Sequence, residues 1–253
     1  MKVIKDKWFY YQLCVGILII GALFSVYLYH MIMQQWLRNI DYPFSPVLFQ
    51  GQFFSFFTYQ SNFLLGVWFL SSAVTFNKPQ YWWKNQYTRI ALTSYISVTC
   101  LTFMGFILPT MLIAKTINVC GVLVGLFFHL ITPILMIVYL FMHQEKITMT
   151  NRQYFKKVFC LYLIYPLLYT GYLSSRFGMY LNDPLLKNIP YDIIFPYALL
   201  TPKDFDMGIG TALELIFSFI IVFIIAYVLF ILTNIMYFFI IKASNKKQKG
   251  LQF

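Results

Sequence analysis

Long apolar runs separated by short polar segments dominate the chain. Each run approaches or exceeds the length of about 20 residues that an α-helix needs to cross the hydrocarbon core of a bilayer. The pattern predicts an all-α polytopic membrane protein, a six-transmembrane-helix bundle with a single transmembrane domain over 1–253. The predicted spans are 8–34, 53–76, 89–114, 119–142, 154–173 and 211–242.

The segment 174–210, which joins the last two spans, is a predicted outer loop of unusual length, punctuated by prolines. Its centre, 189–200, is apolar but too short to cross a bilayer. Long loops without regular structure are usually functional, which favours a lid over the mouth of the bundle. An interfacial loop that only caps the bundle fits the same pattern, and both interpretations stay open.

Positively charged residues are distributed unevenly between the two sides of this six-span arrangement. All of the 19 lysines and arginines fall on the side that carries both termini, except Arg38, Lys115, Arg176, Lys187 and Lys203. The positive-inside rule therefore predicts that both termini are cytoplasmic. The short loops and the lack of a eukaryotic targeting signal favour a multi-pass protein of a bacterial plasma membrane.

The composition supports this class and excludes others. The chain is 60% hydrophobic and only 11% charged, which a soluble domain of 253 residues does not need. Its net charge of +11 predicts no nucleic-acid partner, because the basic residues lie between and beyond the apolar runs, where they set topology. The cysteines show no paired spacing, so neither a disulfide framework nor a metal site is indicated, and no cofactor is predicted.

A histidine lies inside the fourth span. Gly121, Gly125, His129 and Pro133 are four residues apart and follow one ridge of the predicted helix. An ionisable residue inside a membrane span is costly, so His129 is a functional-site candidate. Pro133 lacks an N–H, which is expected to leave the carbonyl of His129 without its helical partner. A structural hydrogen bond to a neighbouring helix is the alternative explanation of His129.

The second span carries a polar row of its own. Thr58, Asn62 and Gly66 are four residues apart, so one side of this helix is small and polar. Small residues permit close helix approach, which predicts that this span pairs with the fourth span. Either Thr58 or Asn62 could then meet His129. Alternatively, the Thr58 hydroxyl bonds back to the preceding turn of its own helix.

Three short motifs resemble a known family. FFTYQSN at 56–62, HLITP at 129–133 and LIYPLLY at 163–169 are similar to motifs of bacterial six-helix relatives of the androgen-induced and androgen-dependent transmembrane proteins. The animal members are intramembrane threonine hydrolases that cleave fatty acid esters of hydroxy fatty acids. The resemblance implies that Thr58 is the nucleophile and His129 the base. Tyr139 departs from the pattern, since the bacterial relatives often carry an acidic residue there.

This chemistry is consistent with the residue types. A threonine hydroxyl needs a base to become nucleophilic, and a neutral histidine within hydrogen-bond reach supplies one. Asn62 and Ser61 are the neutral candidates for orienting the imidazole or stabilising an oxyanion. No carboxylate lies in the middle of a span, so a charged third group would have to come from Asp204, Asp206 or Glu214.

The sequence thus predicts a hydrolase for a lipid or fatty acyl ester, because an apolar bundle suits an acyl chain. The competing hypothesis is a non-catalytic lipid-binding or transport protein with a polar site around the intramembrane histidine. No internal repeat supports the transport hypothesis. The two hypotheses differ in whether loss of the Thr58 hydroxyl abolishes function.

Overall fold

The computed structural model describes residues 6–37, 40–78, 81–113, 119–182, 189–190, 193 and 211–250. These residues form helices joined by turns, and no strand occurs among them. Five helical stretches are long and apolar enough to cross a membrane, which identifies an all-α, multi-pass membrane protein. They are Lys7–Ile32, Gln86–Ile107, Gly121–Met142, Asn151–Met179 and Ile220–Asn245. Each stretch overlaps one of the predicted spans.

The second predicted span, 53–76, is not a single apolar helix. It divides into α2 (Pro46–Ser55) and α3 (Phe57–Val74), and Phe56 between them is extended with φ −78° and ψ 119°. The polar side chains of α3 lower its hydropathy, and most of them are buried against other helices. Because protein rather than lipid surrounds this face, α3 does not need the apolar surface of the other spans.

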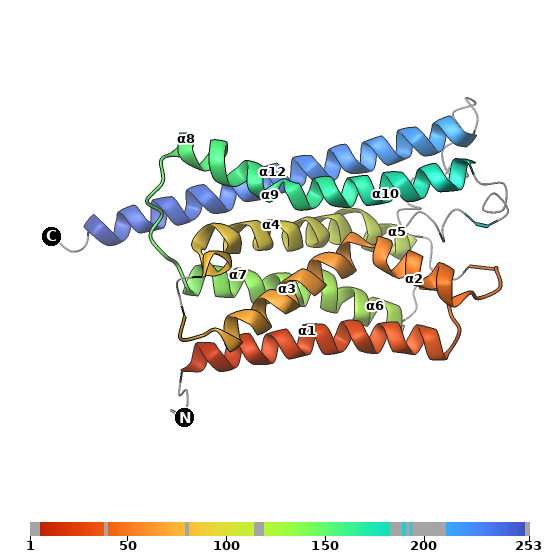
Figure 1. The fold of residues 1–253 in the computed structure, drawn as a ribbon, viewed down its shortest axis with the longest axis horizontal. Coiled ribbons are helices and arrows are strands. Elements are labelled where there is room, and N and C mark those ends of the chain that lie inside the picture. Colours follow the sequence, from red (N-terminus) through yellow and green to blue (C-terminus); the bar gives the residue numbers. More distant parts are fainter. Residues whose placement is uncertain are drawn as a thin grey trace.

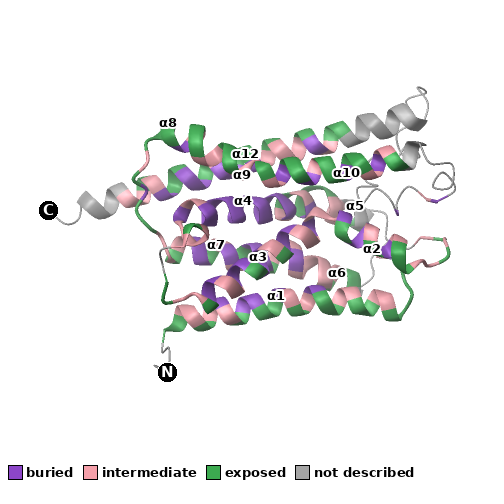
Figure 2. Ribbon diagram, in the orientation of Figure 1, coloured by how far each residue is buried: buried purple, intermediate pink, exposed green. Residues whose placement is uncertain are grey.

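The helices lie roughly side by side, with α1 (Lys7–Ile32) along one edge and α10 (Ile164–Asn182) with α12 (Thr211–Gly250) along the other (Figure 1). Between them, α4 (Gln86–Thr102) is the most buried helix (Figure 2). In the stretch that contains α4, 61% of the most apolar window is buried, against 17% to 22% in the other four stretches. The start of α1 and the end of α12 lie at the same end of the molecule (Figure 1).

Prolines coincide with irregular turns in two spans. The π-helical turns η2 (Phe103–Ile107) and η3 (Phe127–Ile131) directly precede the segments that contain Pro109 and Pro133. Proline lacks an N–H and its ring crowds the carbonyl one turn earlier, and a wider π turn relieves this conflict. Pro109 and Pro133 therefore account for where the third and fourth spans depart from a regular α-helix.

These turns divide the spans into shorter labelled helices. The third span continues from η2 into α5 (Leu108–Ile113), and the fourth consists of α6 (Val119–Leu126), η3 and α7 (Thr132–Met142). The fifth consists of α8 (Asn151–Gln153), the π turn η4 (Tyr154–Phe159), α9 (Cys160–Tyr162) and α10. A short 3-10 turn, η1 (Trp82–Lys84), connects α3 to α4.

The small residues of the second span approach α1 rather than the fourth span. A Cβ added to Gly66 would stand 2.8 Å from Ile20 Cδ1, and one added to Gly16 would stand 2.7 Å from Leu70 Cγ. Glycines on both helices therefore permit the close packing of α1 on α3. The predicted pairing of the second and fourth spans does not use these glycines, because Gly125 packs against Phe103 of η2.

The predicted outer loop 174–210 begins later than the sequence suggested, since α10 continues to Asn182. The remainder of this segment lies outside the described residues except for 189–190 and 193. Both interpretations of the loop, lid and interfacial cap, therefore stay predictions.

Candidate functional site

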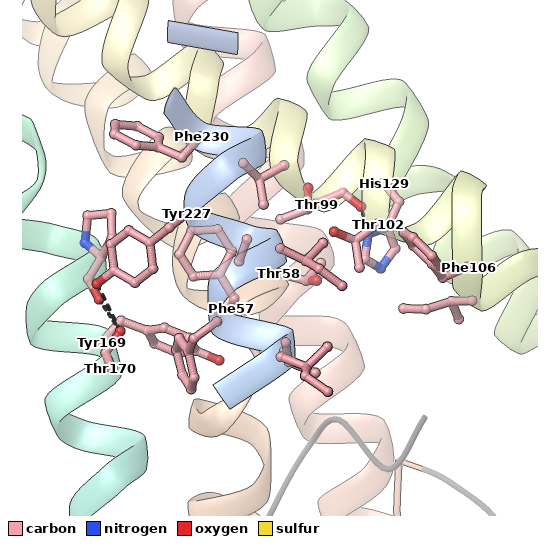
Figure 3. A pocket seen from close by; sticks show the side chains of 18 residues that line it. Phe57, Thr58, Thr99, Thr102, Phe106, His129, Tyr169, Thr170, Tyr227 and Phe230 are labelled. Atoms are coloured by element: carbon pink, nitrogen blue, oxygen red, sulfur yellow. Dashed lines mark hydrogen bonds between the residues drawn. The ribbon is translucent and has the colours of Figure 1, made fainter. Parts of the chain in front are cut away.

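A cavity of about 250 Å³ lies between α3, α4, η2, η3, α10 and α12. Thr58 and His129, the two residues singled out by the sequence, both line it (Figure 3). The cavity wall is largely apolar. Its polar side chains are Thr58, Thr99, Thr102, His129, Tyr169, Thr170 and Tyr227. Such a lining suits a long apolar ligand that is oriented by a few polar groups.

His129 lies in the π turn η3, where one hydrogen bond and one ring contact fix its imidazole. Its Nδ1 atom is 3.1 Å from the carbonyl oxygen of Thr99 in α4. Because a carbonyl can only accept, Nδ1 carries the proton of the neutral imidazole, and Nε2 keeps its lone pair. The ring lies flat on Phe103, with 4.3 Å between the ring centroids and 4° between the planes. The imidazole is thus held in one tautomer and one plane.

Gly125, one turn before His129, makes room for this stacking. A Cβ at Gly125 would stand 3.0 Å from Phe103 Cζ and 3.2 Å from its Cε2. Any larger residue would therefore push Phe103 away, and with it the surface on which the imidazole rests. The sequence identified Gly125 as part of the histidine row, and its partner is the third span.

Asn62 joins α3 to the fourth span at η3, and none of its hydrogen bonds with described residues involves the His129 imidazole. Its amide nitrogen donates to the carbonyls of Thr58 at 2.8 Å and Phe128 at 3.2 Å, and its amide oxygen accepts from Thr132 Oγ1 at 2.6 Å. In the π turn, the Thr132 amide donates to the Phe127 carbonyl, and Pro133 has no N–H. The Phe128 carbonyl therefore has no backbone donor and needs a side-chain donor.

This arrangement refines two expectations. The carbonyl that receives side-chain donors is that of Phe128, one residue before the His129 carbonyl named from the sequence. The group that orients the imidazole is the Thr99 carbonyl, whereas Asn62 and Ser61 were the residues proposed for this task. Ser61 donates within its own helix, to the Thr58 carbonyl at 3.2 Å. The second and fourth spans therefore meet through Asn62.

Thr58 is the second residue of α3, where the chain resumes a helix after extended Phe56. The Phe56 carbonyl accepts from the amides of Tyr59 and Gln60 at 3.1 and 3.2 Å. In the part of the chain that the structure describes, neither the amide nor the hydroxyl of Thr58 has a hydrogen-bond partner. The helix break removes the preceding turn to which the hydroxyl could have bonded.

The third motif holds this helix break from the other side of the cavity. Tyr169 of α10 donates to the Ser55 carbonyl at 2.7 Å, directly before Phe56. The ring of Tyr169 also packs against Phe57, with centroids 5.0 Å apart. The FFTYQSN, HLITP and LIYPLLY segments therefore converge on one cavity, through Asn62 on one side and Tyr169 on the other.

No hydrogen bond joins Thr58 to His129 among the described residues. The described carboxylates do not line the cavity, and Asp204, Asp206 and the side chain of Glu214 lie outside the described part of the chain. Within the residues searched, no group of three or more histidine, cysteine or acidic side chains could hold a metal ion.

Sequence reasoning missed Thr99, Thr102 and Phe103, all from the third span. Thr99 and Thr102 are polar residues three apart in an apolar run, a signal that could have marked this face. The contribution of Thr99 comes from its backbone carbonyl, and that role has no signature in the residue type.

No family model, curated protein or solved structure matches this chain.

Proposed function

We propose that this protein is an intramembrane hydrolase that cleaves a lipid or fatty acyl ester, with Thr58 as nucleophile and His129 as general base. The observation that carries the proposal is that these two residues, from different spans, line one largely apolar cavity. The Thr58 hydroxyl is unengaged by described residues, and the imidazole is held as the tautomer with a basic Nε2. Both properties favour nucleophilic catalysis.

The reaction balances with these groups and water. His129 Nε2 takes the hydroxyl proton as Thr58 Oγ attacks the ester carbonyl, and the imidazolium returns that proton to the departing alcohol. The resulting acyl-threonine ester is hydrolysed when His129 deprotonates a water molecule that attacks the same carbonyl, and the imidazolium then protonates Thr58 Oγ as it leaves. The products are a carboxylic acid and an alcohol, and Thr58 is restored.

Two donors are available for the oxyanion of each tetrahedral intermediate. The amide of Thr58 lies at the amino end of α3, where the helix dipole also favours negative charge. Thr102 contributes a hydroxyl to the cavity wall on the side of His129 (Figure 3). The Phe103 face and the Thr99 carbonyl replace the carboxylate that orients the base in many hydrolases.

We infer six membrane spans, the five long apolar helical stretches and α3. In this placement the protein lies in a bacterial plasma membrane with both termini in the cytoplasm. Basic residues support it, because Lys84, Arg89, Arg152 and Lys242 belong to segments at the end of the molecule where α1 begins (Figure 1). The substrate is a lipid, and no nucleic acid takes part.

A second function, lipid binding or transport without chemistry, is favoured by one observation. Thr58 and His129 line the same cavity but are not hydrogen-bonded to each other among the described residues. Hydrolases without substrate often show long catalytic contacts that tighten in the complex, which is why we prefer the catalytic function.

The test is labelling of the purified, detergent-solubilised protein with a fluorophosphonate that carries an alkyl chain. Wild-type protein is expected to be labelled at Thr58, and Thr58→Ala and His129→Ala are expected to lose the label. Thr58→Ser should keep it. Thr233→Ala is the matched control, because Thr233 is a buried threonine whose hydroxyl bonds back to the Leu229 carbonyl at 2.8 Å. Absence of label in folded wild-type protein would leave the binding function as the better one.

A further inference from the structure

A groove on the outside of the bundle meets the cavity from the membrane side. Thr170 of α10 and several residues of α12 line it, among them Phe223, Ile224, Tyr227 and Val228. Thr170, Phe223 and Tyr227 also line the cavity, so they form the partition between the two hollows. Cavity and groove therefore lie on opposite sides of the same three side chains.

The outer side of this partition faces lipid. Ile224 and Val228 are 57% and 48% exposed, and both lie on a helix apolar enough to span the membrane. In a bilayer, acyl chains rather than water cover such a surface. The groove's two hydroxyl-bearing residues, Thr170 and Tyr227, are bonded to each other at 3.0 Å between oxygens. The groove thus offers a surrounding acyl chain only apolar contacts.

We propose that the gap between α10 and α12 is a lateral portal through which one acyl chain of a bilayer lipid enters the cavity, and that the Thr170–Tyr227 pair is its latch. Figure 3 shows the latch on one side of the cavity and His129 on the other. A chain that enters here passes Phe223 and extends towards the imidazole. The portal deepens the proposed function, because it delivers an ester from the membrane without passage through water.

The latch itself is one hydrogen bond, and beside it Phe223 packs against Tyr169 and Leu173 of α10. Thr170 Oγ1 is also 2.8 Å from the Pro166 carbonyl, so this hydroxyl keeps a partner when it releases Tyr227. Opening therefore costs one neutral hydrogen bond, which corresponds to about a twofold to tenfold change in an equilibrium. The Phe223 ring is the remaining barrier, and it is 8% exposed, between the two hollows.

The test uses proteoliposomes that contain a phosphocholine lipid whose two alkyl chains are both ether-linked, one of them with a diazirine near its methyl end. This probe has no chain ester to hydrolyse, so its entry is measured independently of Thr58. After photolysis, mass spectrometry quantifies label on Val98 and Thr102, which line the cavity and not the groove. Label on the exposed face of α12 normalises the amount of probe.

Wild-type protein is expected to be labelled on this face of α4, and Tyr227→Phe to raise that label about twofold to tenfold. Ile224→Trp should fill the groove and lower the label severalfold. Leu232→Trp is the matched control, because Leu232 lies on α12 outside the groove. Its exposed fraction, 59%, is similar to that of Ile224. Its label should equal that of wild type.

Equal labelling of α4 in Ile224→Trp and wild type would overturn the portal and indicate entry from the outer end of the bundle. Absence of label on α4 in all proteins would overturn it as well. If the fluorophosphonate fails to label Thr58 while Ile224→Trp still blocks the lipid probe, the portal stands and the proposed hydrolysis does not.

Discussion

The two ends of the bundle are built in opposite ways. At the end where α1 begins, buried charge and several hydrogen bonds join four helical segments to one another. On the α10 side of the cavity, by contrast, α10 is joined to its neighbours by single hydrogen bonds, Thr170–Tyr227 and Tyr169–Ser55. Regions with few cross-helix contacts open most readily, and sites that admit ligands are drawn from such regions.

The charged end is organised by Lys84, Arg89, His143 and Glu145. Arg89 is 2% exposed, donates to the His143 carbonyl and pairs with Glu145. The Lys84 ammonium donates to the Thr75 carbonyl at 2.7 Å and so caps the carboxyl end of α3. Burial lowers the pKa of Lys84, and nearby Arg89 lowers it further, while Glu145 opposes both. These contacts join the end of α3, the start of α4 and the residues that follow α7.

The strongest test of this contrast is Arg89→Ala. The change leaves the His143 carbonyl without its buried donor and opens a cavity in the charged end. We expect a loss of about 3 kcal/mol in the free energy of unfolding, the low end of the cost of breaking a buried ion pair. The cost is low because Glu145 is 59% exposed and is hydrated when Arg89 is removed. Denaturant unfolding in detergent measures it. Arg152→Ala, on the exposed surface at the same end, should be nearly silent, and equal stability of the two variants would contradict the contrast.

Asn62→Leu tests the connection between the cavity and the rest of the bundle. The substitution keeps volume but removes the cross-helix donor to the Phe128 carbonyl. We expect a loss of about 1–2 kcal/mol, because Thr132 still donates to that carbonyl. Fluorophosphonate labelling of Thr58 should fall more than the folded fraction does. The control is Ser61→Ala, which removes a hydrogen bond within α3 and should change neither stability nor labelling appreciably. If Asn62→Leu behaves like Ser61→Ala, Asn62 does not connect the cavity to the rest of the bundle.

Tyr169→Phe removes one hydroxyl from the cavity half and keeps the ring. Without its donor to the Ser55 carbonyl, the break before α3 is held less firmly, at a cost of about 1 kcal/mol. The measurement is the rate of Thr58 labelling, together with thermal unfolding. Tyr172→Phe provides the control, because Tyr172 does not line the cavity and is 37% exposed. Wild-type rates in Tyr169→Phe would mean that the break is set locally.

These expectations also show what the sequence could and could not reveal. The five long apolar helices follow from hydropathy alone, because burial of a continuous apolar run in lipid leaves little choice. The break at Phe56 could not be foreseen, since Phe56 resembles its apolar neighbours and its extended conformation depends on contacts such as Tyr169 to Ser55, made across the bundle. Proline signalled irregularity near His129, but the sequence pattern did not show that the irregularity is a π turn.

The candidate site shows the same limit. His129 could be selected because an ionisable residue in an apolar span is costly, whereas the role of Thr58 was implied by the resemblance of its motif. Asn62 was recognised as a cross-helix residue, whereas its partner, the Phe128 carbonyl, became available only through the π turn and Pro133 together. Thr99 orients the imidazole through its backbone, and every residue has a carbonyl. Backbone partners of this kind require coordinates.

The smallest expected effect concerns pH at the charged end. Burial lowers the pKa of His143 below its usual 6.5, and the Arg89 charge lowers it further, while Asp6 and Glu145 oppose the shift. Between the lowered pKa and 6.5 the unfolded chain binds more protons than the folded one, so stability rises with pH in this window and is flat for this residue above it. Acidification from pH 7 to below 6.5 should therefore destabilise the wild type.

His143→Phe should reduce that dependence while preserving the stacking on Tyr139, whose ring lies 4.9 Å away and within 7° of parallel. The measurement is the difference between wild type and variant in the midpoint of unfolding at several pH values, because other groups titrate equally in both proteins. Identical pH profiles for wild type and His143→Phe would show that the charged end tolerates a second cation, and the two halves would then differ in packing alone.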